Sequence, residues 1–336
     1  MTEQAASRTV TIRDVARVAG VSTSTVSRVL NDPKGLGSKW AAPDTTERIF
    51  ALAEERGYRK NPYAASLRTA KSHMIGVVVP RLQDYVLATM YEGIDEAASE
   101  HGYFTVVSNS LDDPTAHRAK AEKLLDRRAD GLIFGDALFE DPFLDELADR
   151  GVAFTLVSRR SPGHRSVTCD DYAGGRMVAE HLVASGRRTF GLIAGNPRAS
   201  TSIDRCAGFL DALAGHGLGV DPERVVPGGF DAPAGSAAAA RILAVGPLPE
   251  AVFAVNDFAA IGALGVFARE GVTVPEDLAL VGFNDTPLAG SVGLTTVRSP
   301  MHSIGRQGFE MLMDVLDGRD VESVRLPPEL VVRTSA

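Results

Sequence analysis

The apolar residues near the start of the chain repeat with helical spacing. They fall at i, i+3, i+4 and i+7 and so share one helical face: Ile12, Val15, Ala16 and Ala19. Thr11 and Asp14 have the spacing of a capping box, and Gly20 is where we expect this helix to end. The pattern therefore predicts a short amphipathic helix that begins after Thr11.

A second short helix is predicted directly after the first. Ser22 can cap its first turn, and Val26, Val29 and Leu30 give it a buried side. The turn between the two helices is only about three residues long, which is the spacing of a helix-turn-helix. The opposite face of the second helix carries small polar side chains and one cation: Thr23, Ser24, Ser27 and Arg28.

A third helix is predicted after residues 32–43, which are loop-like in their glycine and proline content. Pro43 or Asp44 begins it and Gly57 ends it. Its inward positions are apolar: Ile49, Leu52 and Ala53. Residues 1–60 are therefore expected to form a small all-α head.

The next segment is a candidate linker. Asn61 and Pro62 have the pattern of a helix start, because proline is tolerated in the first helical turn. The stretch from Pro62 to Arg68 is too short to be helical alone. We therefore expect residues 61–72 to order only when something holds them.

From Ile75 onward the pattern changes to short apolar runs separated by amphipathic helices. The runs are IGVVVP, YFTVVS, GLIFG, AFTLVS, FGLIAG, AVFAV and LALVGF. Continuous apolar strands between helices are typical of parallel sheets covered on both faces. The length of this region, residues 73–336, predicts an α/β body of two doubly wound parallel-sheet lobes.

Charge is distributed unevenly along the chain. The whole sequence has a net charge of -8, but residues 1–72 hold 12 Lys or Arg against 7 Asp or Glu. A basic head on an acidic body confines attraction for a polyanion to the head. The polar face of the second helix lies in this basic part.

Most other chemistry has little support in the sequence. Cys169 and Cys206 lack metal-ligand spacing, and the seven histidines are scattered, so we expect no metal. No serine stands in a nucleophile elbow, and Gly215, Gly217 and Gly219 lack the pattern of a dinucleotide site, so we expect neither an enzyme nor a cofactor. The start has no signal-peptide core and the apolar runs are too short to span a membrane, which predicts a cytoplasmic protein.

The polar face of the second helix favours DNA as its partner. A solvated surface would carry similar residues. However, small hydroxyl side chains allow a close approach to a groove, and Arg28 can pair bidentately with guanine. The local positive charge points the same way.

Residues just after the carboxyl ends of the predicted strands are candidates for a ligand site, because open α/β sheets bind ligands there. The alternative for each is a helix cap or a turn. The candidates are Asp84, Val86, Asp136, Ser158, Arg159, Asn196, Asn256, Asp257, Asn284 and Asp285.

The stretch TIRDVARVAGVSTSTVSRVLN resembles the N-terminal signature of the lactose/galactose repressor (LacI/GalR) family. The resemblance continues through ERGYRKNPYAASLR, DRCAGFLDAL, NDFAAIGAL, VPEDLALVGFND and LTTVRSP, and covers nearly the whole chain. It implies a regulator whose body resembles the type I periplasmic sugar-binding proteins. It divides that body into lobes of about 73–170 with 300–324, and about 171–299 with 325–336.

The resemblance implies roles for individual residues. In the family, positions matching Thr23, Ser24 and Arg28 read bases, a hinge helix at residues 62–68 orders on operator DNA, and Leu67 is the wedge in the minor groove. The candidate DNA-binding residues are Thr11, Ser22, Thr23, Ser24, Ser27, Arg28, Asn31, Asn61, Tyr63, Ala64, Leu67 and Arg68.

For the effector site, the resemblance adds Arg205 as the arginine that grips sugar hydroxyls or carboxylates, Phe230 as an aromatic that stacks on a sugar or else packs in the core, and Ser299. It also implies that Asn256 and Asn284 match two other ligand-contacting positions of the family. The candidate effector-binding residues are Asp84, Val86, Asp136, Ser158, Arg159, Asn196, Arg205, Phe230, Asn256, Asn284 and Ser299.

The sequence departs from the family pattern in several places. The loop at residues 32–43 is longer than usual, Ala42 replaces a capping serine, and Ala65 replaces a polar or basic hinge residue. Ser158 and Asn284 stand where aspartates are usual, so the effector need not present the same pair of hydroxyls.

These observations predict a ligand-responsive repressor of carbohydrate uptake or catabolism genes. We expect a homodimer on a pseudo-palindromic operator, with a sugar-like effector between the lobes. Two other classes remain open at this point: a sugar-binding module for transport, and a sugar-metabolising enzyme on the same lobes.

Overall fold

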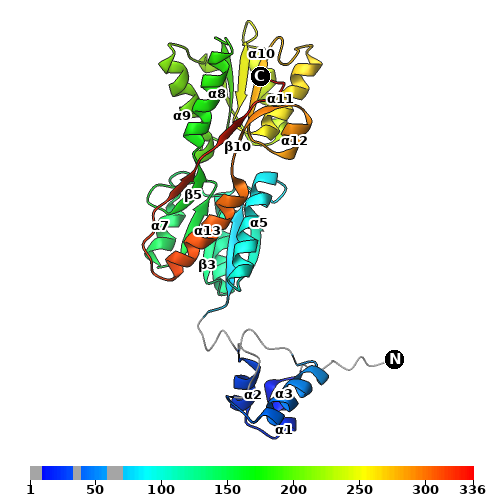
Figure 1. The fold of residues 1–336 in the computed structure, drawn as a ribbon. Helices are drawn as coiled ribbons and strands as arrows, with labels where there is room; N and C mark the ends of the chain where they lie inside the picture. The colour runs from blue at the N-terminus through cyan, green and yellow to red at the C-terminus, as the bar shows by residue number, and fades with distance from the viewer. Residues whose placement is uncertain (1–9, 33–38, 59–70) are drawn as a thin grey trace, which may run out of the picture. The chain divides into compact units, whose positions relative to one another are not determined.

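The computed structural model describes residues 10–32, 39–58 and 71–336 (Figure 1). Contacts divide the chain into two units, Met1–Ser72 and His73–Ala336, which we call the head and the body. Within the described residues, no helix combines the length and the apolar character needed to cross a membrane.

The described part of the head contains three helices, α1 (Ile12–Ala19), α2 (Thr23–Leu30) and α3 (Pro43–Glu55). The backbone N–H and the hydroxyl of Thr11 both donate to the Asp14 carboxylate, at 3.0 and 2.7 Å. Gly20 ends α1 in the left-handed region at φ +65°, which a residue with a Cβ adopts only with strain. The predicted helix-turn-helix is therefore present, with its expected caps.

The sequence left Pro43 or Asp44 as the first residue of the third helix, and the structure decides between them. The helix begins at Pro43, and Ala42 precedes it without a side-chain hydrogen bond. Proline in the first turn has no N–H to leave unpaired. The core of the head is small, and its fully buried side chains are Val15, Ala19, Val26, Val29 and Ile49.

The body contains two six-stranded sheets within residues 71–336. The first has the order β11-β5-β4-β3-β1-β2 and is parallel throughout. Its strands are β1 (Met74–Val79), β2 (Phe104–Asn109), β3 (Gly131–Phe134), β4 (Phe154–Val157), β5 (Ser166–Cys169) and β11 (Val324–Leu326).

The second sheet has the order β12-β10-β9-β8-β6-β7. Its pairs are parallel except that β12 runs antiparallel to β10. Its strands are β6 (Phe190–Gly195), β7 (Val225–Pro227), β8 (Ala251–Ala254), β9 (Ala279–Asn284), β10 (Thr295–Arg298) and β12 (Glu329–Val331). Each sheet is the centre of one lobe.

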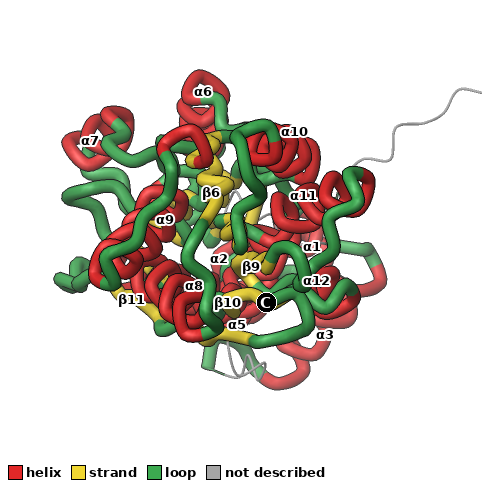
Figure 2. The backbone as a smooth tube through the Cα atoms, turned by 90° about the horizontal axis from the view of Figure 1, so that it is seen from above, coloured by secondary structure: helices red, strands yellow, loops and turns green. Residues whose placement is uncertain are grey.

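Helices cover both faces of each sheet, as buried parallel strands require (Figures 1 and 2). In the first lobe α5 (Tyr85–Glu100) packs against α13 (Met301–Leu316), and α6 (Pro114–Asp126) and α7 (Pro142–Asp149) cover the other face. In the second lobe the packed pairs are α8 (Asp171–Ala184) with α9 (Ser200–Gly215), and α10 (Ala232–Leu243) with α11 (Asp257–Arg269). Two short helices complete the lobe: η1 (Pro222–Arg224) and α12 (Pro287–Ser291).

The α8–α9 pair approaches closely because both helices have glycine at the contact. A Cβ on Gly175 would collide with the carbonyl oxygen of Arg205, and a Cβ on Gly208 with that of Tyr172. This packing sets the position of Arg205 relative to the start of α8.

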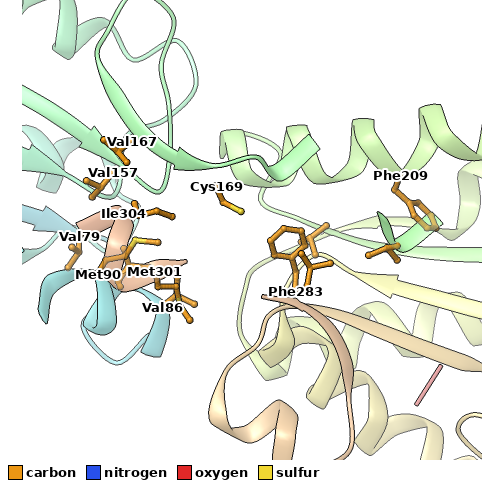
Figure 3. Close-up of a cluster of buried hydrophobic side chains, with 14 of the residues drawn as sticks. Val79, Val86, Met90, Val157, Val167, Cys169, Phe209, Phe283, Met301 and Ile304 are labelled. Atoms are coloured by element: carbon orange, nitrogen blue, oxygen red, sulfur yellow. The ribbon is translucent and has the colours of Figure 1, made fainter. Parts of the chain in front are cut away.

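The chain crosses between the lobes after β5, after β10 and after β11. The first lobe therefore ends with β11 at Leu326, close to the boundary of about residue 324 expected from the sequence. The apolar core continues up to the crossings. Figure 3 shows Cys169 between Val86, Met90 and Met301 of the first lobe and Phe283 of the second.

Seven strands match the apolar runs of the sequence, and five others have no counterpart among them. The five are short or polar in part, as in SVTC of β5, VVP of β7 and TTVR of β10. Alternation of side chains gives little signal over three or four residues. Their pairing with longer neighbours holds them in the sheets.

Candidate functional site

The exposed face of α2 carries the predicted DNA-reading residues. Thr23, Ser24 and Arg28 are exposed, whereas Val26 and Val29 on the opposite face are fully buried. Ser27 is half-buried and accepts a hydrogen bond from the Asn31 side-chain amide at 3.3 Å. Helical periodicity thus orients these side chains as the sequence indicates.

Two candidates in the head also cap its helices. The Ser22 hydroxyl accepts the backbone N–H of Thr25 at 3.1 Å and so caps α2. Thr11 is bound to Asp14, as described above. The hinge candidates lie outside the described residues: Asn61, Tyr63, Ala64, Leu67 and Arg68.

In the body, Arg205 is the centre of a buried polar cluster. Its Nε donates to Asp171 Oδ1 at 2.8 Å and its Nη1 donates to the Val255 carbonyl at 2.7 Å. Its Nη2 donates to Asn284 Oδ1 at 3.3 Å. The Phe283 ring centroid lies 3.7 Å from its Cζ, which adds a cation–π contact. Three protein acceptors and one aromatic ring therefore hold the guanidinium in place.

Arg159 brings a second buried guanidinium from the first lobe. Its Nη1 donates to Asp112 Oδ1 at 2.7 Å and to the Asp136 carbonyl at 3.3 Å. The ring centroid of Phe230, in the second lobe, lies 5.7 Å from its Cζ. Arg159 and Phe230 thus meet across the junction between the lobes.

Asp84 stands at the N-cap of α5, where its carboxylate accepts the Val86 N–H at 3.0 Å. Burial raises the pKa of Asp84, while that hydrogen bond and the charges of Arg159 and Arg205 hold the pKa down. The carboxylate therefore lies within electrostatic reach of both guanidinium groups.

Asn256 and Asn284 complete this arrangement. Asn256 caps α11 and its side-chain amide donates to the Phe230 carbonyl at 2.6 Å. Asn284, at φ +111°, is in a conformation that favours glycine. We call Asp84, Arg159, Arg205, Phe230 and Asn284 the junction cluster.

The remaining candidates lie at or near strand ends but are engaged elsewhere. The Asp136 carboxylate accepts His117 Nδ1 at 2.8 Å, in a small buried pocket of the first lobe. Asn196 accepts the N–H of Arg198 at 2.9 Å, as a turn residue does. Val86 is buried in the core, Ser158 is held at φ +67°, and Ser299 is buried.

Asp171 is the main site residue that sequence reasoning missed. It is buried against Arg205, and burial raises the pKa of Asp171 to about 6, although Arg205 opposes the rise. In sequence it is one of two adjacent aspartates at a helix start, which indicates only a cap. Asp112, the partner of Arg159, was also missed, because an aspartate in a polar turn indicates only a turn residue.

Asp257 and Asp285 were candidates only as residues after strands, and the structure places them in networks of the second lobe. Asp257 accepts the Thr296 hydroxyl at 2.6 Å and the Thr286 N–H at 2.7 Å. Asp285 pairs with Arg298 and Arg333.

The lobes also share direct hydrogen bonds. Arg160 of the first lobe is paired with Asp204 of α9 at 2.6 Å, and its N–H donates to the Ser200 hydroxyl at 2.8 Å. The N–H of Phe139 donates to the carbonyl of Arg198 at 2.9 Å. These contacts join the two lobes directly.

Two family models match separate parts of the chain. Residues 11–61 match the lacI family of bacterial regulatory proteins, and residues 179–336 match the periplasmic binding protein-like domain. The chain is 33% identical to the HTH-type transcriptional regulator GalS of Salmonella typhimurium over 308 residues, 90% of this chain and 89% of that one. It is 29% identical to the transcriptional repressor PurR of Haemophilus influenzae over 334 residues, 97% of this chain and 98% of that one.

Solved structures agree with the sequence matches. The Lac repressor dimer bound to operator and the anti-inducer ONPF aligns with a TM-score of 0.86 at 28% identity, over 98% of this chain and 99% of that one. The complex of the regulator CelR with cellobiose aligns with a TM-score of 0.73 at 30% identity, over 97% of this chain and 100% of that one. The predicted fold class and resemblance are confirmed, and the chain belongs to the lacI family of bacterial transcriptional regulators.

Proposed function

We propose that this regulator is a ligand-responsive repressor that acts in the cytoplasm. It binds a pseudo-palindromic operator as a homodimer and controls genes of carbohydrate uptake or catabolism. A sugar-like effector at the junction cluster changes its affinity for DNA. Its relatives include regulators described with an operator or with cellobiose bound, which supports both halves of the proposal.

The observation that carries the effector site is the meeting of polar groups from both lobes in one cluster. Arg159 and Asp84 come from the first lobe, and Arg205, Phe230 and Asn284 from the second. A ligand bound between them gains contacts that exist only when the lobes stand in one relative position. Its binding therefore favours that position over others.

The charges of the cluster favour a neutral effector. Each guanidinium already has a carboxylate partner, Asp171 for Arg205 and Asp112 for Arg159, and Asp84 adds a further acidic group. A phosphate would meet no uncompensated positive charge here. Hydroxyl groups can accept from the arginines and donate to Asp84 and Asn284, and Phe230 offers an apolar face for a sugar ring.

The response is a population shift between two lobe arrangements. The contacts of Arg160 with Asp204 and Ser200 stabilise the arrangement seen here. An effector that prefers the other arrangement breaks them and, through the linker at residues 61–72, alters the spacing of the two heads on DNA. The coupling free energy in such systems is typically about 1–3 kcal/mol.

Two observations support a homodimer. Leu288 and Val292, one turn apart at α12, are 51% and 42% exposed, as apolar residues covered by a second copy would be. A single helix-turn-helix also makes few base contacts, and twofold symmetry doubles them on a palindromic site.

DNA selection with the full-length chain tests the DNA half. Duplexes enriched from a randomised pool should contain inverted repeats, and their affinity should fall steeply with salt because phosphate contacts release counterions. Enrichment without symmetry would contradict the dimer, and no enrichment would contradict the repressor itself.

A thermal-shift screen tests the effector half. Neutral sugars and oligosaccharides should raise the unfolding midpoint of the body by mass action, more than sugar phosphates or purines do. The Arg205→Lys and Phe230→Ala variants should lose that shift. A shift caused only by phosphorylated ligands would overturn the neutral-effector proposal.

A further inference from the structure

Trp40 is the single tryptophan of the chain, and it lies beside the recognition arginine. It stands in the turn just before α3, three residues ahead of Pro43, and it is 41% exposed. The Cζ of Arg28, in the last turn of α2, lies 5.0 Å from the centroid of its ring. The Nζ of Lys39 lies 5.3 Å from the same centroid.

This contact joins two elements of the head that the sequence pattern leaves unconnected. Arg28 belongs to α2, and Trp40 belongs to the turn that leads into α3. An arginine guanidinium is attracted to the negative face of an indole ring, and indole is the aromatic group that attracts it most. The contact therefore ties the tip of Arg28 to the start of α3.

The position of Arg28 makes this restraint useful. An exposed arginine samples many rotamers, and most of that freedom is lost when its planar fork pairs with a base. A neighbour that already holds the guanidinium reduces the conformational entropy that the side chain loses on binding. The indole ring also restricts the direction in which the Arg28 guanidinium points. Pairing with a base requires one direction, whereas a contact with a phosphate does not.

We propose that Trp40 is a specificity-determining positioning residue, which holds the guanidinium of Arg28 in the orientation that reads a base. The inference rests on the proposed DNA-reading role of α2 and names a residue outside the helix-turn-helix that supports it. Trp40 acts through Arg28, so its effect on DNA recognition disappears when Arg28 is absent.

A double-mutant cycle measures this dependence directly. The probe is a fluorescein-labelled duplex selected from a randomised pool by the full-length wild-type chain. Trp40→Ala is expected to weaken binding about two- to five-fold and to relax the preference at the base pair that Arg28 reads. In the Arg28→Ala background, Trp40→Ala is expected to have no further effect.

Two variants control the cycle. Trp40→Phe keeps an aromatic face and is expected to retain most of the affinity and the base preference. Arg17 is an exposed arginine on α1 that pairs with Asp14, so Arg17→Ala removes the same charge at another place. The effect of Arg17→Ala on DNA affinity is expected to add to that of Trp40→Ala. Circular dichroism of each full-length variant shows that the head remains folded.

Fluorescence provides a readout that a purely structural role for Trp40 would not produce. Because the chain has one tryptophan, its emission reports on this ring alone. Arg28→Ala should change the emission of the DNA-free protein, whereas Arg17→Ala should not. Adding the selected duplex should change the wild-type emission, because bound DNA changes the surroundings of the Arg28–Trp40 pair.

The possible failures are distinguishable. If no duplex is enriched, the proposed DNA-reading function fails and the positioning role fails with it. If a duplex is enriched but Trp40→Ala costs the same with and without Arg28, Trp40 contacts DNA itself and this inference alone is overturned. An unchanged emission in Arg28→Ala would likewise refute the contact.

Discussion

The head and the junction cluster hold the side chains of their proposed sites in opposite ways. On α2, Thr23, Ser24 and Arg28 are exposed, so their substitution has little effect on the packing of the head. At the junction, Arg205 and Arg159 are buried and each is already paired with a carboxylate. Substitutions in the head should therefore change recognition more than folding, and substitutions at the junction should change both.

The largest expected effect tests the buried side of this contrast. Arg205→Ala leaves Asp171 buried without its cation and should lower the free energy of unfolding of the body by about 3–5 kcal/mol. Urea unfolding of the full-length chain, followed by far-ultraviolet circular dichroism, measures the change. Adding Asp171→Asn should recover part of the loss, because it removes the stranded charge. If Arg205→Ala lowered the free energy of unfolding no more than the exposed Arg17→Ala does, the contrast between buried and exposed arginines would be wrong.

Asp257 gives the body a pH dependence of predictable sign. Burial raises the pKa of Asp257 to about 6, although hydrogen bonds from Thr296 and Thr286 oppose the rise. In the unfolded chain the pKa of aspartate is about 3.9, so between roughly pH 4 and 6 the folded state binds more protons. The contribution of Asp257 alone to the free energy of unfolding should therefore fall by on the order of 3 kcal/mol as pH rises through that window. Urea unfolding at several pH values should show a flatter profile for Asp257→Asn, and equal profiles would refute the assignment.

Arg28→Ala tests the exposed side. It should remove discrimination at one base pair of each half-site, worth roughly 1–3 kcal/mol, and leave the unfolding midpoint unchanged. Competition between duplexes that differ by single base pairs measures the discrimination. A uniform loss of affinity for all sequences would make Arg28 a phosphate contact instead.

The smallest effect concerns the start of α2. Ser22→Ala removes the hydroxyl that accepts the Thr25 N–H, and should cost the head about 1 kcal/mol of stability. Ser22→Asp keeps an acceptor at the cap and should cost less. Amide hydrogen exchange in the first turn of α2 separates the two variants. Equal protection in wild type and Ser22→Ala would show that the cap contributes nothing.

The same contrast explains what the sequence could predict. The helices of the head, their caps and the outward face of α2 follow from spacing within about ten residues, and the structure has them where expected. The longer strands follow in the same way from their apolar runs. Short strands such as β5 and β11 depend on neighbours far away in the chain and had no local signal.

The members of the junction cluster were predictable, but their buried partners were not. All five members were named from strand-end position or family resemblance, and the structure connects Arg205 to Asn284 and Arg159 to Phe230. The pairing of Arg205 with Asp171 depends on the glycine contacts between α8 and α9, which no periodicity reveals. Trp40 escaped notice for a similar reason, since its contact with Arg28 spans two elements.

The three crossings between the lobes determine the order in which parts of the chain can fold during synthesis. The head is encoded entirely before residue 73 and has its own core, so it can fold while most of the body is still untranslated. The first lobe needs α13 and β11, which emerge only after nearly all of the second lobe. A growing chain therefore completes its DNA-binding part long before either lobe is complete, and a prematurely released product would carry a head with no sensor attached.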